Sequence, residues 1–214
     1  MPDKLQLILR IPGILLAISV HEYAHARAAY TLGDDTAMLE GRMTIDPWAH
    51  IDPMGALMLF VFGFGWARPV RVDVFRLRRP LKDMALIAFA GPLSNFIVAF
   101  LLEIATILLF TRISFTGTSW RYLPMVLEQA AWINAGLAVF NLIPIPPLDG
   151  SKVLQAFLPY RFYNIWDFME RYGFIFLVVL LTMGFLRLPM QIVVTRFMQF
   201  VQIIGVRLSL FVFP

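Results

Sequence analysis

The chain has no cysteine, little charge and only three histidines among its 214 residues. Without cysteine it can form no disulfide scaffold, no thiolate metal site and no thiol nucleophile. Charged residues make up 15%, against about 25% in an ordinary soluble domain, whereas 59% are hydrophobic. A soluble domain of this length could not bury so much apolar surface, and the mean hydropathy of +0.74 indicates a membrane protein. The net charge of +4 then favours an anionic membrane surface over nucleic acid as its partner.

Five apolar runs are candidates for membrane-crossing helices. A hydrocarbon core of about 30 Å needs roughly 20 helical residues. The last run carries a polar stripe and could lie along the interface instead, although its length favours spanning. We therefore expect an all-α polytopic membrane protein with about five transmembrane helices, over residues 5–32, 84–110, 126–145, 172–186 and 190–213.

The connection between the first two runs has a different pattern. Residues 39–46 and 70–74 alternate between apolar and polar, which is typical of half-buried strands and predicts a small membrane-associated β-sheet. The apolar stretch 55–67 is too short to span and is expected to be re-entrant or interfacial. Basic residues crowd positions 68–82, just before the second run, which favours a cytoplasmic location for this connection.

His21, Glu22 and His25 form an HExxH motif near the end of the first run. On a helix, residues four apart share one face, so both imidazoles can bind one zinc ion. Glu22 would lie within reach of a water on that metal, take its proton and pass it to a leaving amine. The alternative is that these polar residues satisfy one another between helices, but such residues at membrane depth are costly and functional by default.

A hydrolytic zinc site of this kind needs a third protein ligand. Asp149 is the best candidate, because Pro144, Pro146 and Pro147 break the third helix beside it and Gly150 allows an unusual backbone. Irregular backbone at membrane depth is tolerated only where protein covers it or where it lines a wet cavity. From the residues alone, a role for Asp149 in capping the next helix is equally open.

Three ordered motifs carry a specific resemblance: HEYAH at 21–25, GPLSN at 91–95 and NLIPIPPLDG at 141–150. With the connecting segments GRMTIDPWAHIDPMGAL and GWARPV, they resemble the site-2 proteases, which are intramembrane zinc metalloproteases of peptidase family M50. The likeness is to the small prokaryotic branch that lacks PDZ and CBS domains.

The resemblance implies one zinc ion per chain, held by His21, His25 and Asp149, with Glu22 as the catalytic residue. It implies an endopeptidase that cleaves transmembrane segments of single-span membrane proteins. Residues 1–214 would form a single intramembrane metalloprotease domain. We expect a multi-pass protein in the lipids of a prokaryotic cytoplasmic membrane, with its active site open towards the cytoplasm. The oligomeric state does not follow from the sequence. The domain's expected parts are a catalytic core at 5–150, the insert at 39–82 and C-terminal helices at 151–214.

Three further residues are expected to meet the substrate. Asn141 matches a family asparagine near the active site, and its amide could bind the substrate backbone or the developing oxyanion. It could equally satisfy carbonyls freed by the prolines that follow it. Val70 and Val72 lie on a predicted strand edge to which an unwound substrate could add.

The remaining polar residues are expected to have structural roles. We expect Asn95 to hydrogen-bond between helices, Glu103 to pair with a polar neighbour or line a water path, and His50 to take part in a turn. Two rival functions stay open: a membrane protein that binds or transports metal with the same ligands, and a membrane scaffold without a metal.

Overall fold

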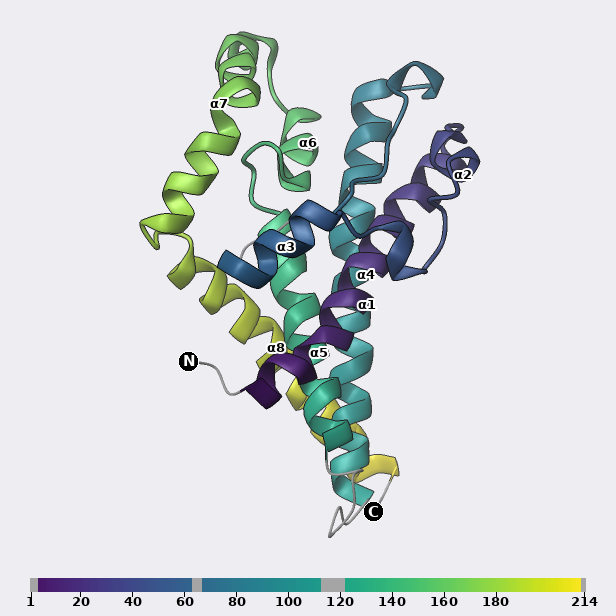
Figure 1. The fold of residues 1–214 in the computed structure, drawn as a ribbon, viewed down its shortest axis with the longest axis vertical. Coiled ribbons are helices and arrows are strands. Elements are labelled where there is room, and N and C mark those ends of the chain that lie inside the picture. Colours follow the sequence, from purple (N-terminus) through teal and green to yellow (C-terminus); the bar gives the residue numbers. More distant parts are fainter. Residues whose placement is uncertain (1–3, 63–66, 113–121, 213–214) are drawn as a thin grey trace. The chain divides into compact units, whose positions relative to one another are not determined.

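The computed structural model describes residues 4–62, 67–112 and 122–212, and it is built from helices (Figure 1). The expected all-α class is confirmed. In the described connections there are three 3₁₀ turns, η1 (Pro47–Ala49), η2 (Val74–Arg76) and η4 (Tyr160–Phe162). The α-helices are α1 (Lys4–Thr31), α2 (Thr36–Leu39), α3 (Pro53–Phe62), α4 (Pro80–Arg112), α5 (Tyr122–Asn141), α6 (Asp149–Gln155), α7 (Tyr163–Thr182) and α8 (Arg187–Val212).

Among the described residues, three helices are long and apolar enough to cross a membrane: Pro80–Phe110 in α4, Tyr122–Asn141 in α5 and Arg187–Phe211 in α8. They support an integral membrane protein. The two other expected spans fall in α1, which carries the HEYAH group, and in α7, whose first half carries several charged residues. The predicted number of about five spans is therefore not confirmed.

The chain divides into two compact units, each assembled from segments that are distant in sequence. The first, which we call the bundle unit, contains Met1–Ala17, Asn95–Asn141 and Ile175–Pro214. The second, which we call the motif unit, contains Ile18–Ser94 and Leu142–Phe174. All the predicted zinc ligands and the predicted general base belong to the motif unit.

Small side chains and one amide pair hold the bundle unit together. Its core contains Ala99, Ala131, Ala135, Val139, Val194 and Met198, and small residues of this kind let membrane helices approach closely. The Nδ2 atom of Asn95 donates to Asn134 Oδ1 and to the carbonyl of Ala17, both over 2.9 Å. The predicted interhelical role of Asn95 is confirmed.

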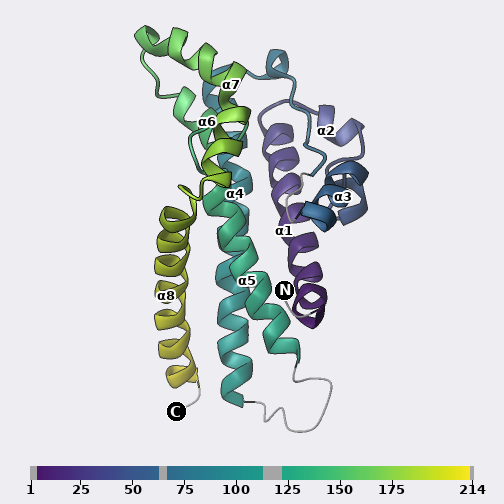
Figure 2. The ribbon, with the colours of Figure 1, turned by 60° about the vertical axis from the view of Figure 1, so that its left-hand side comes forward.

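Helix α8 lies along α4 and runs in the same direction (Figure 2). The rings of Phe96 and Phe197 are 4.8 Å apart, and further along, Gln202 Nε2 donates to Glu103 Oε1 over 2.8 Å. The second contact supplies the polar neighbour that was expected for Glu103. Because α8 follows a helix able to span the membrane, this packing favours a spanning α8 over an interfacial one.

The described residues of the insert do not form the predicted β-sheet. Residues 39–46 end α2 and continue as turns, and residues 70–73 have no regular secondary structure and no strand partner among the described residues. In the described part of the chain the one isolated bridge joins Ile51 to Ala67. The alternating pattern therefore did not mark a strand pair.

Side chains explain why 70–73 forms no ladder. The N–H of Val70 donates to Glu22 Oε2 over 2.9 Å, and the N–H of Asp73 donates to Asp34 Oδ2 over 2.8 Å. Backbone groups bonded to carboxylates of α1 and of the turn after it are not available to a neighbouring strand. The segment is thus fixed by acids outside it, which period-two alternation does not report.

Several boundaries differ from those expected. The apolar stretch 55–67 begins in α3, whose ten residues are about 15 Å long and cannot span; residues 63–66 lie outside the described residues. Helix α5 ends at Asn141, because the prolines stop it four residues before the predicted end. The break before α8 falls at Gly184, whose φ of +77° ends α7, rather than at residues 187–189.

His50 is fully buried in the turn-rich part of the insert. Its Nε2 lies 2.7 Å from the carbonyl oxygen of Thr44. This contact spans six residues of the connection before α3. The expected turn role of His50 is therefore confirmed.

Candidate metal centre

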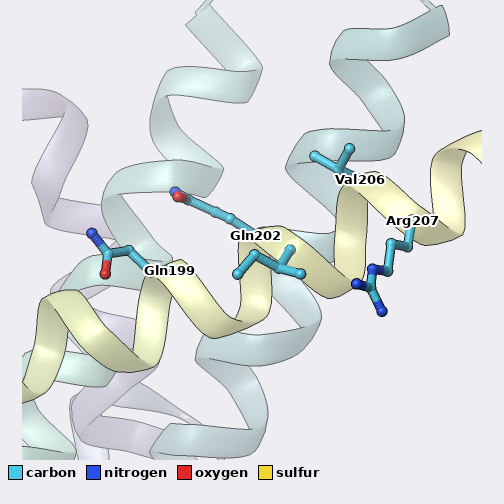
Figure 3. A pocket seen from close by; sticks show the side chains of 5 residues that line it. Gln199, Gln202, Val206 and Arg207 are labelled. Carbon is cyan, nitrogen blue, oxygen red and sulfur yellow. The ribbon is translucent and has the colours of Figure 1, made fainter.

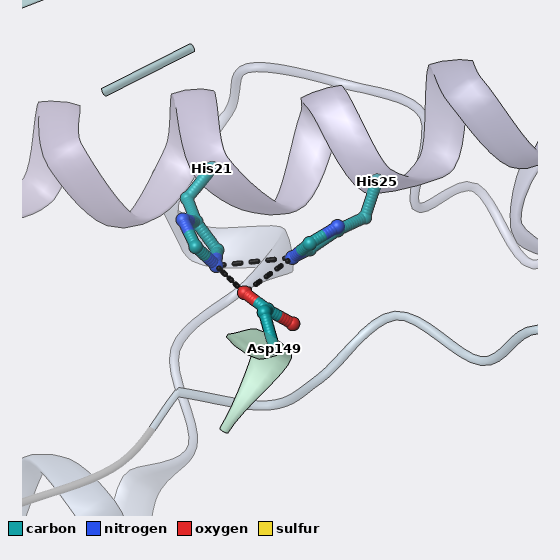
Figure 4. Close-up of side chains that lie close together, drawn as sticks. All are labelled: His21, His25 and Asp149. Atoms are coloured by element: carbon teal, nitrogen blue, oxygen red, sulfur yellow. Dashed lines mark hydrogen bonds and ion pairs between the residues drawn. The ribbon is translucent and has the colours of Figure 1, made fainter. Parts of the chain in front are cut away.

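His21 and His25 lie one turn apart on one face of α1, and both are buried. Their Nε2 atoms are 3.0 Å apart. Asp149, the first residue of α6, brings its Oδ2 to 3.1 Å from His21 Nε2 and 3.3 Å from His25 Nε2 (Figure 4). The three predicted ligands therefore form a single group, to which each contributes one ligand atom.

Asp149 reaches the histidines at the end of a run of turns, 142–148, that follows α5. Gly150 makes this path possible, because a Cβ there would clash with the carbonyl of Leu142. The N-cap of α6 is Leu148, and no side chain caps the helix. Asp149 therefore does not cap α6, and the alternative left open by the sequence is removed.

The separations of the three ligand atoms suit one tetrahedral zinc ion. With metal–ligand bonds of about 2.0–2.1 Å, two ligand atoms of a tetrahedral site lie about 3.3 Å apart. The separations here are 3.0, 3.1 and 3.3 Å. Two imidazoles and one carboxylate are also a donor set of hydrolytic zinc sites, which keep the fourth position open.

The hydrogen bonding of His25 supports the same assignment. Its Nδ1 lies 2.7 Å from the carbonyl oxygen of Ile87 on α4. A carbonyl only accepts, so Nδ1 carries the proton, and Nε2 is left to bind a metal ion beside Asp149 or, without a metal, to carry a second proton. A bare lone pair that faces a carboxylate is unfavourable unless a cation or a proton lies between them, and metal-bound histidines are usually held through their other nitrogen in this way.

Gly91 allows α4 to pack directly against the two imidazoles. A Cβ at this position would lie 2.5 Å from His25 Nε2 and 2.7 Å from His21 Cε1. Ser94, one turn later, turns its Oγ back to the carbonyl of Gly91 over 2.6 Å. The GPLSN motif therefore supplies a small-residue face of α4 beside the imidazoles.

Glu22 is buried beside the ligands, and one of its oxygens is held by the backbone. Oε2 accepts the Val70 N–H, while Oε1 has no partner among the described residues. Val70 was predicted to lie on a substrate-binding edge, but its N–H is already used within the protein. One carboxylate oxygen of Glu22 is thus fixed and the other is left for chemistry.

Val72 and Asn141 lie apart from these contacts. Val72 is half-buried and packs against the cluster that contains Ala29 and Ile87 in the motif unit. Asn141 is the last residue of α5, in the bundle unit, and its Nδ2 donates to the carbonyl of Leu137 over 3.2 Å. Their substrate-binding roles stay predictions.

Comparison with known proteins gives the family. The family description "Peptidase family M50" matches residues 112–184, which include Asp149. The chain is also 38% identical over 171 residues to the "Putative zinc metalloprotease YwhC" of Bacillus subtilis (strain 168), over 78% of this chain and 77% of the relative. The chain belongs to peptidase family M50.

A second relative of this M50 protein has the same description, with the name Rip2, and comes from Mycobacterium tuberculosis (strain ATCC 25618 / H37Rv). It is 31% identical over 177 residues, which are 81% of this chain and 66% of the relative. No solved structure matches the chain significantly. As an M50 member, the protein is a metalloprotease with zinc as its cofactor, and His21, His25 and Asp149 form a group that can hold the ion.

Two contacts of this M50 site escaped sequence reasoning because they come from the main chain. The carbonyl of Ile87 orients His25, and the N–H of Val70 orients Glu22. Every residue except proline has both groups, so residue types do not mark them. The nearest signal was the GPLSN motif, which begins four residues after Ile87, one turn along α4.

Proposed function

We propose that the protein is an intramembrane zinc endopeptidase in which His21, His25 and Asp149 hold the metal and Glu22 is the general base. The convergence of three ligand atoms beside a buried carboxylate carries this proposal. The donor set and the tautomer that Ile87 imposes on His25 support it.

Zinc held by these residues would act as a Lewis acid that polarises a peptide carbonyl and makes water a nucleophile at neutral pH. Glu22 takes the proton of the attacking water and gives it to the leaving amine. The bond from Val70 N–H keeps the carboxylate in one orientation, so that Oε1 is the oxygen that receives the proton. The carbonyl of Ile87 keeps His25 from rotating away from Asp149.

The proposed substrates are single-span membrane proteins, cut within their transmembrane segments. A peptide bond in a helix is hydrogen-bonded and shielded, so the substrate must become locally extended before attack. In an extended chain, Val72 presents its N–H and C=O on the same side as Val70, whose N–H points to Glu22. We therefore propose that Val72 pairs with the extended substrate, and that Val72→Pro lowers cleavage while zinc content is unchanged.

Asn141 is proposed to bind the substrate backbone or the developing oxyanion through its amide. Its present bond to Leu137, within its own helix, leaves one amide hydrogen and the amide oxygen for such a contact. Asn141→Ala should then lower the cleavage rate while the zinc content stays at the wild-type level.

We place the protein in the cytoplasmic membrane of a prokaryote, with the site open to the cytoplasm. Basic residues near span ends favour that side, and six of them precede the apolar part of α4. All six are exposed, as headgroup contact requires, and no nucleic acid partner is proposed; they are Arg68, Arg71, Arg76, Arg78, Arg79 and Lys82.

The test is cleavage of a set of single-span peptides by purified protein in proteoliposomes, with the zinc content measured on the same samples. Wild-type protein should bind zinc stoichiometrically and cleave. Glu22→Gln should keep the zinc and lose about 10²–10⁴-fold of the cleavage rate, the usual contribution of a general base. Glu103→Gln is the matched control, because it neutralises a buried carboxylate in the bundle unit and should leave cleavage and zinc unchanged.

The rival functions give different results in the same vesicles. A metal transporter with these ligands would carry zinc across the bilayer and tolerate Glu22→Gln. A scaffold would contain no stoichiometric zinc. Cleavage by Glu22→Gln at the wild-type rate would overturn the proposed role of Glu22.

A further inference from the structure

Helix α8 carries an arginine that nothing in the described chain neutralises. Arg196 is exposed, and it has no ion pair or hydrogen bond with residues 4–62, 67–112 or 122–212. Yet α8 is one of the three helices apolar enough to cross a membrane. A charged side chain inside a span is costly, and it normally pairs with another polar group or lines a wet cavity.

The packing of the bundle unit shows at which level Arg196 lies. Asn95 of α4 bonds Asn134 of α5, and the next residue, Phe96, packs on Phe197 of α8. Arg196 precedes Phe197 by one residue. It is therefore level with Asn134.

The length of α5 shows how deep in the hydrocarbon core this level lies. Its 20 residues, Tyr122–Asn141, are about 30 Å long, which equals the thickness of the hydrocarbon core. Asn134 lies about 4 Å from the midpoint of α5, so Arg196 is about 11 Å from the nearer interface. By contrast, Arg207 lies near the end of α8, where a long side chain can reach the headgroups.

The exposed face of α8 around Arg196 continues beside a recess. Positions 196, 199, 203 and 207 follow one another at the spacing of one helix face, all four side chains are exposed, and three of the four are polar. Gln199 lies one turn after Arg196, and no partner of its amide lies in the described part of the chain. The recess has a volume of about 500 Å³ and is lined by Gln199, Gln202, Ile203, Val206 and Arg207 (Figure 3).

We propose that this face of α8 binds a transmembrane helix of another protein, one that carries a carboxylate near the middle of its span. The carboxylate would pair with the guanidinium of Arg196 and accept a hydrogen bond from the amide of Gln199. The recess that begins at Gln199 would seat the neighbouring side chains of the partner helix. The ion pair between this carboxylate and Arg196 neutralises a guanidinium that is otherwise exposed deep in the hydrocarbon core.

Two other occupants fit less well. A lipid phosphate lies at the interface, about 11 Å from the level of Arg196. In the described part of a second copy, the exposed carboxylate on a helix able to span is Glu128, six residues before Asn134 and so about 9 Å from that level. Two copies inserted with the same topology are related by an axis along the membrane normal, which preserves depth, so their Glu128 and Arg196 stay apart.

Because the chain has no cysteine, a single introduced cysteine can carry one dye. Leu210→Cys places one dye at an exposed position near the end of α8. The probe is a labelled, leucine-rich single-span peptide with one central Glu, added to proteoliposomes and followed by energy transfer. The proteins carry Glu22→Gln so that no probe is cut. The comparison peptides carry central Leu, central Gln, or Glu one turn from the end.

The central-Glu peptide should bind about tenfold more tightly than the central-Leu peptide, with the central-Gln and end-Glu peptides weaker than central Glu. Arg196→Leu should abolish this preference. Arg207→Leu, which removes the same charge from the same face near the helix end, should preserve it. Wild-type zinc content in each variant shows that the fold is intact.

Equal binding of the Glu and Leu peptides would overturn the proposal, as would a preference that survives Arg196→Leu. Energy transfer between protein copies without peptide, lost in Arg196→Leu, would assign the face to a second copy and overturn it too. The binding measurement does not depend on proteolysis, so its outcome is independent of the proposed activity.

Discussion

Asp34 and Asp149, both in the motif unit, have buried carboxylate oxygens, but their surroundings are opposite in kind. Asp34 is fully buried, and donors surround it: Oδ1 accepts from the N–H and hydroxyl of Thr36, and Oδ2 accepts from the N–H of Asp73. The buried Oδ2 of Asp149 instead lies against two imidazole nitrogens, and that of His25 needs a metal ion or a proton between it and the carboxylate.

This difference separates a structural carboxylate from one that is arranged for a ligand. Hydrogen bonds already satisfy Asp34, so it ties the turn after α1 to segment 70–73 without any bound group. The arrangement at Asp149 brings acceptors together, and acceptors repel one another unless a cation or proton lies between them. Burial alone does not distinguish the two roles, whereas the direction of the hydrogen bonds does.

The largest effect should come from Asp149→Ala. Removal of one of three proposed ligands should abolish stoichiometric zinc binding and lower the cleavage rate by more than about 100-fold. Even the loss of a residue that only hydrogen-bonds to a metal ligand typically lowers metal affinity or activity by about 10–100-fold. Zinc analysis and the cleavage assay measure the two effects. Stoichiometric zinc in this variant would show that Asp149 is not a ligand.

Gly91→Ala should have the next largest effect, although it changes no ligand. The added methyl group would press on the ring of His25, so zinc affinity should fall by about 10–100-fold, as for other changes behind metal ligands. Gly136→Ala is the control, since a Cβ there meets nothing within 4 Å and alanine is the better helix former. Competition with a fluorescent zinc chelator measures the affinity. Equal zinc affinity in the two variants would mean that α4 does not position the imidazoles.

The sequence predicted which candidate ligands come together because their geometry is local or is forced by the chain. Residues four apart on a helix must share a face, so the HExxH spacing fixed the relation of His21 to His25. The prolines after α5 had to produce irregular backbone, and Asp149 was the acid at its end. What it could not predict was the main-chain carbonyl of Ile87, because tertiary packing alone decides which backbone group meets which side chain.

The wrong prediction of strands in the insert also comes from contacts that the sequence does not show. Alternation predicts a strand when one face of the segment is buried, but Leu39 and Ile45 are 69% and 66% exposed. In a membrane protein, an apolar side chain can face outward without cost. Alternation of apolar and polar residues therefore no longer shows that one face of the segment is buried. The sequence could not show that acids of α1 and of the next turn bind the N–H groups of Val70 and Asp73, and those bonds decide the conformation.

The smallest effect concerns pH and tests the Asp34 side of the comparison. Burial by itself would raise the pKa of Asp34, but the hydrogen bonds from Thr36 and Asp73 and the charge of Arg76 hold it below its ordinary value of 3.8. The native state therefore binds this proton less tightly than the unfolded chain does. The resulting stabilisation is present above the ordinary pKa and is lost as the pH falls below it.

Asp34→Asn should therefore destabilise the metal-free protein by about 1–2 kcal/mol at pH 7, the usual loss when hydrogen bonds to a charged group are broken. The difference from wild-type protein should shrink as the pH falls below about 4. Thermal unfolding of both proteins in detergent across this range measures it, and zinc content at pH 7 should be unchanged in Asp34→Asn. A difference that stays constant with pH would mean that the donors around Asp34 favour the neutral acid as much as the carboxylate. Donor direction would then no longer distinguish Asp34 from Asp149.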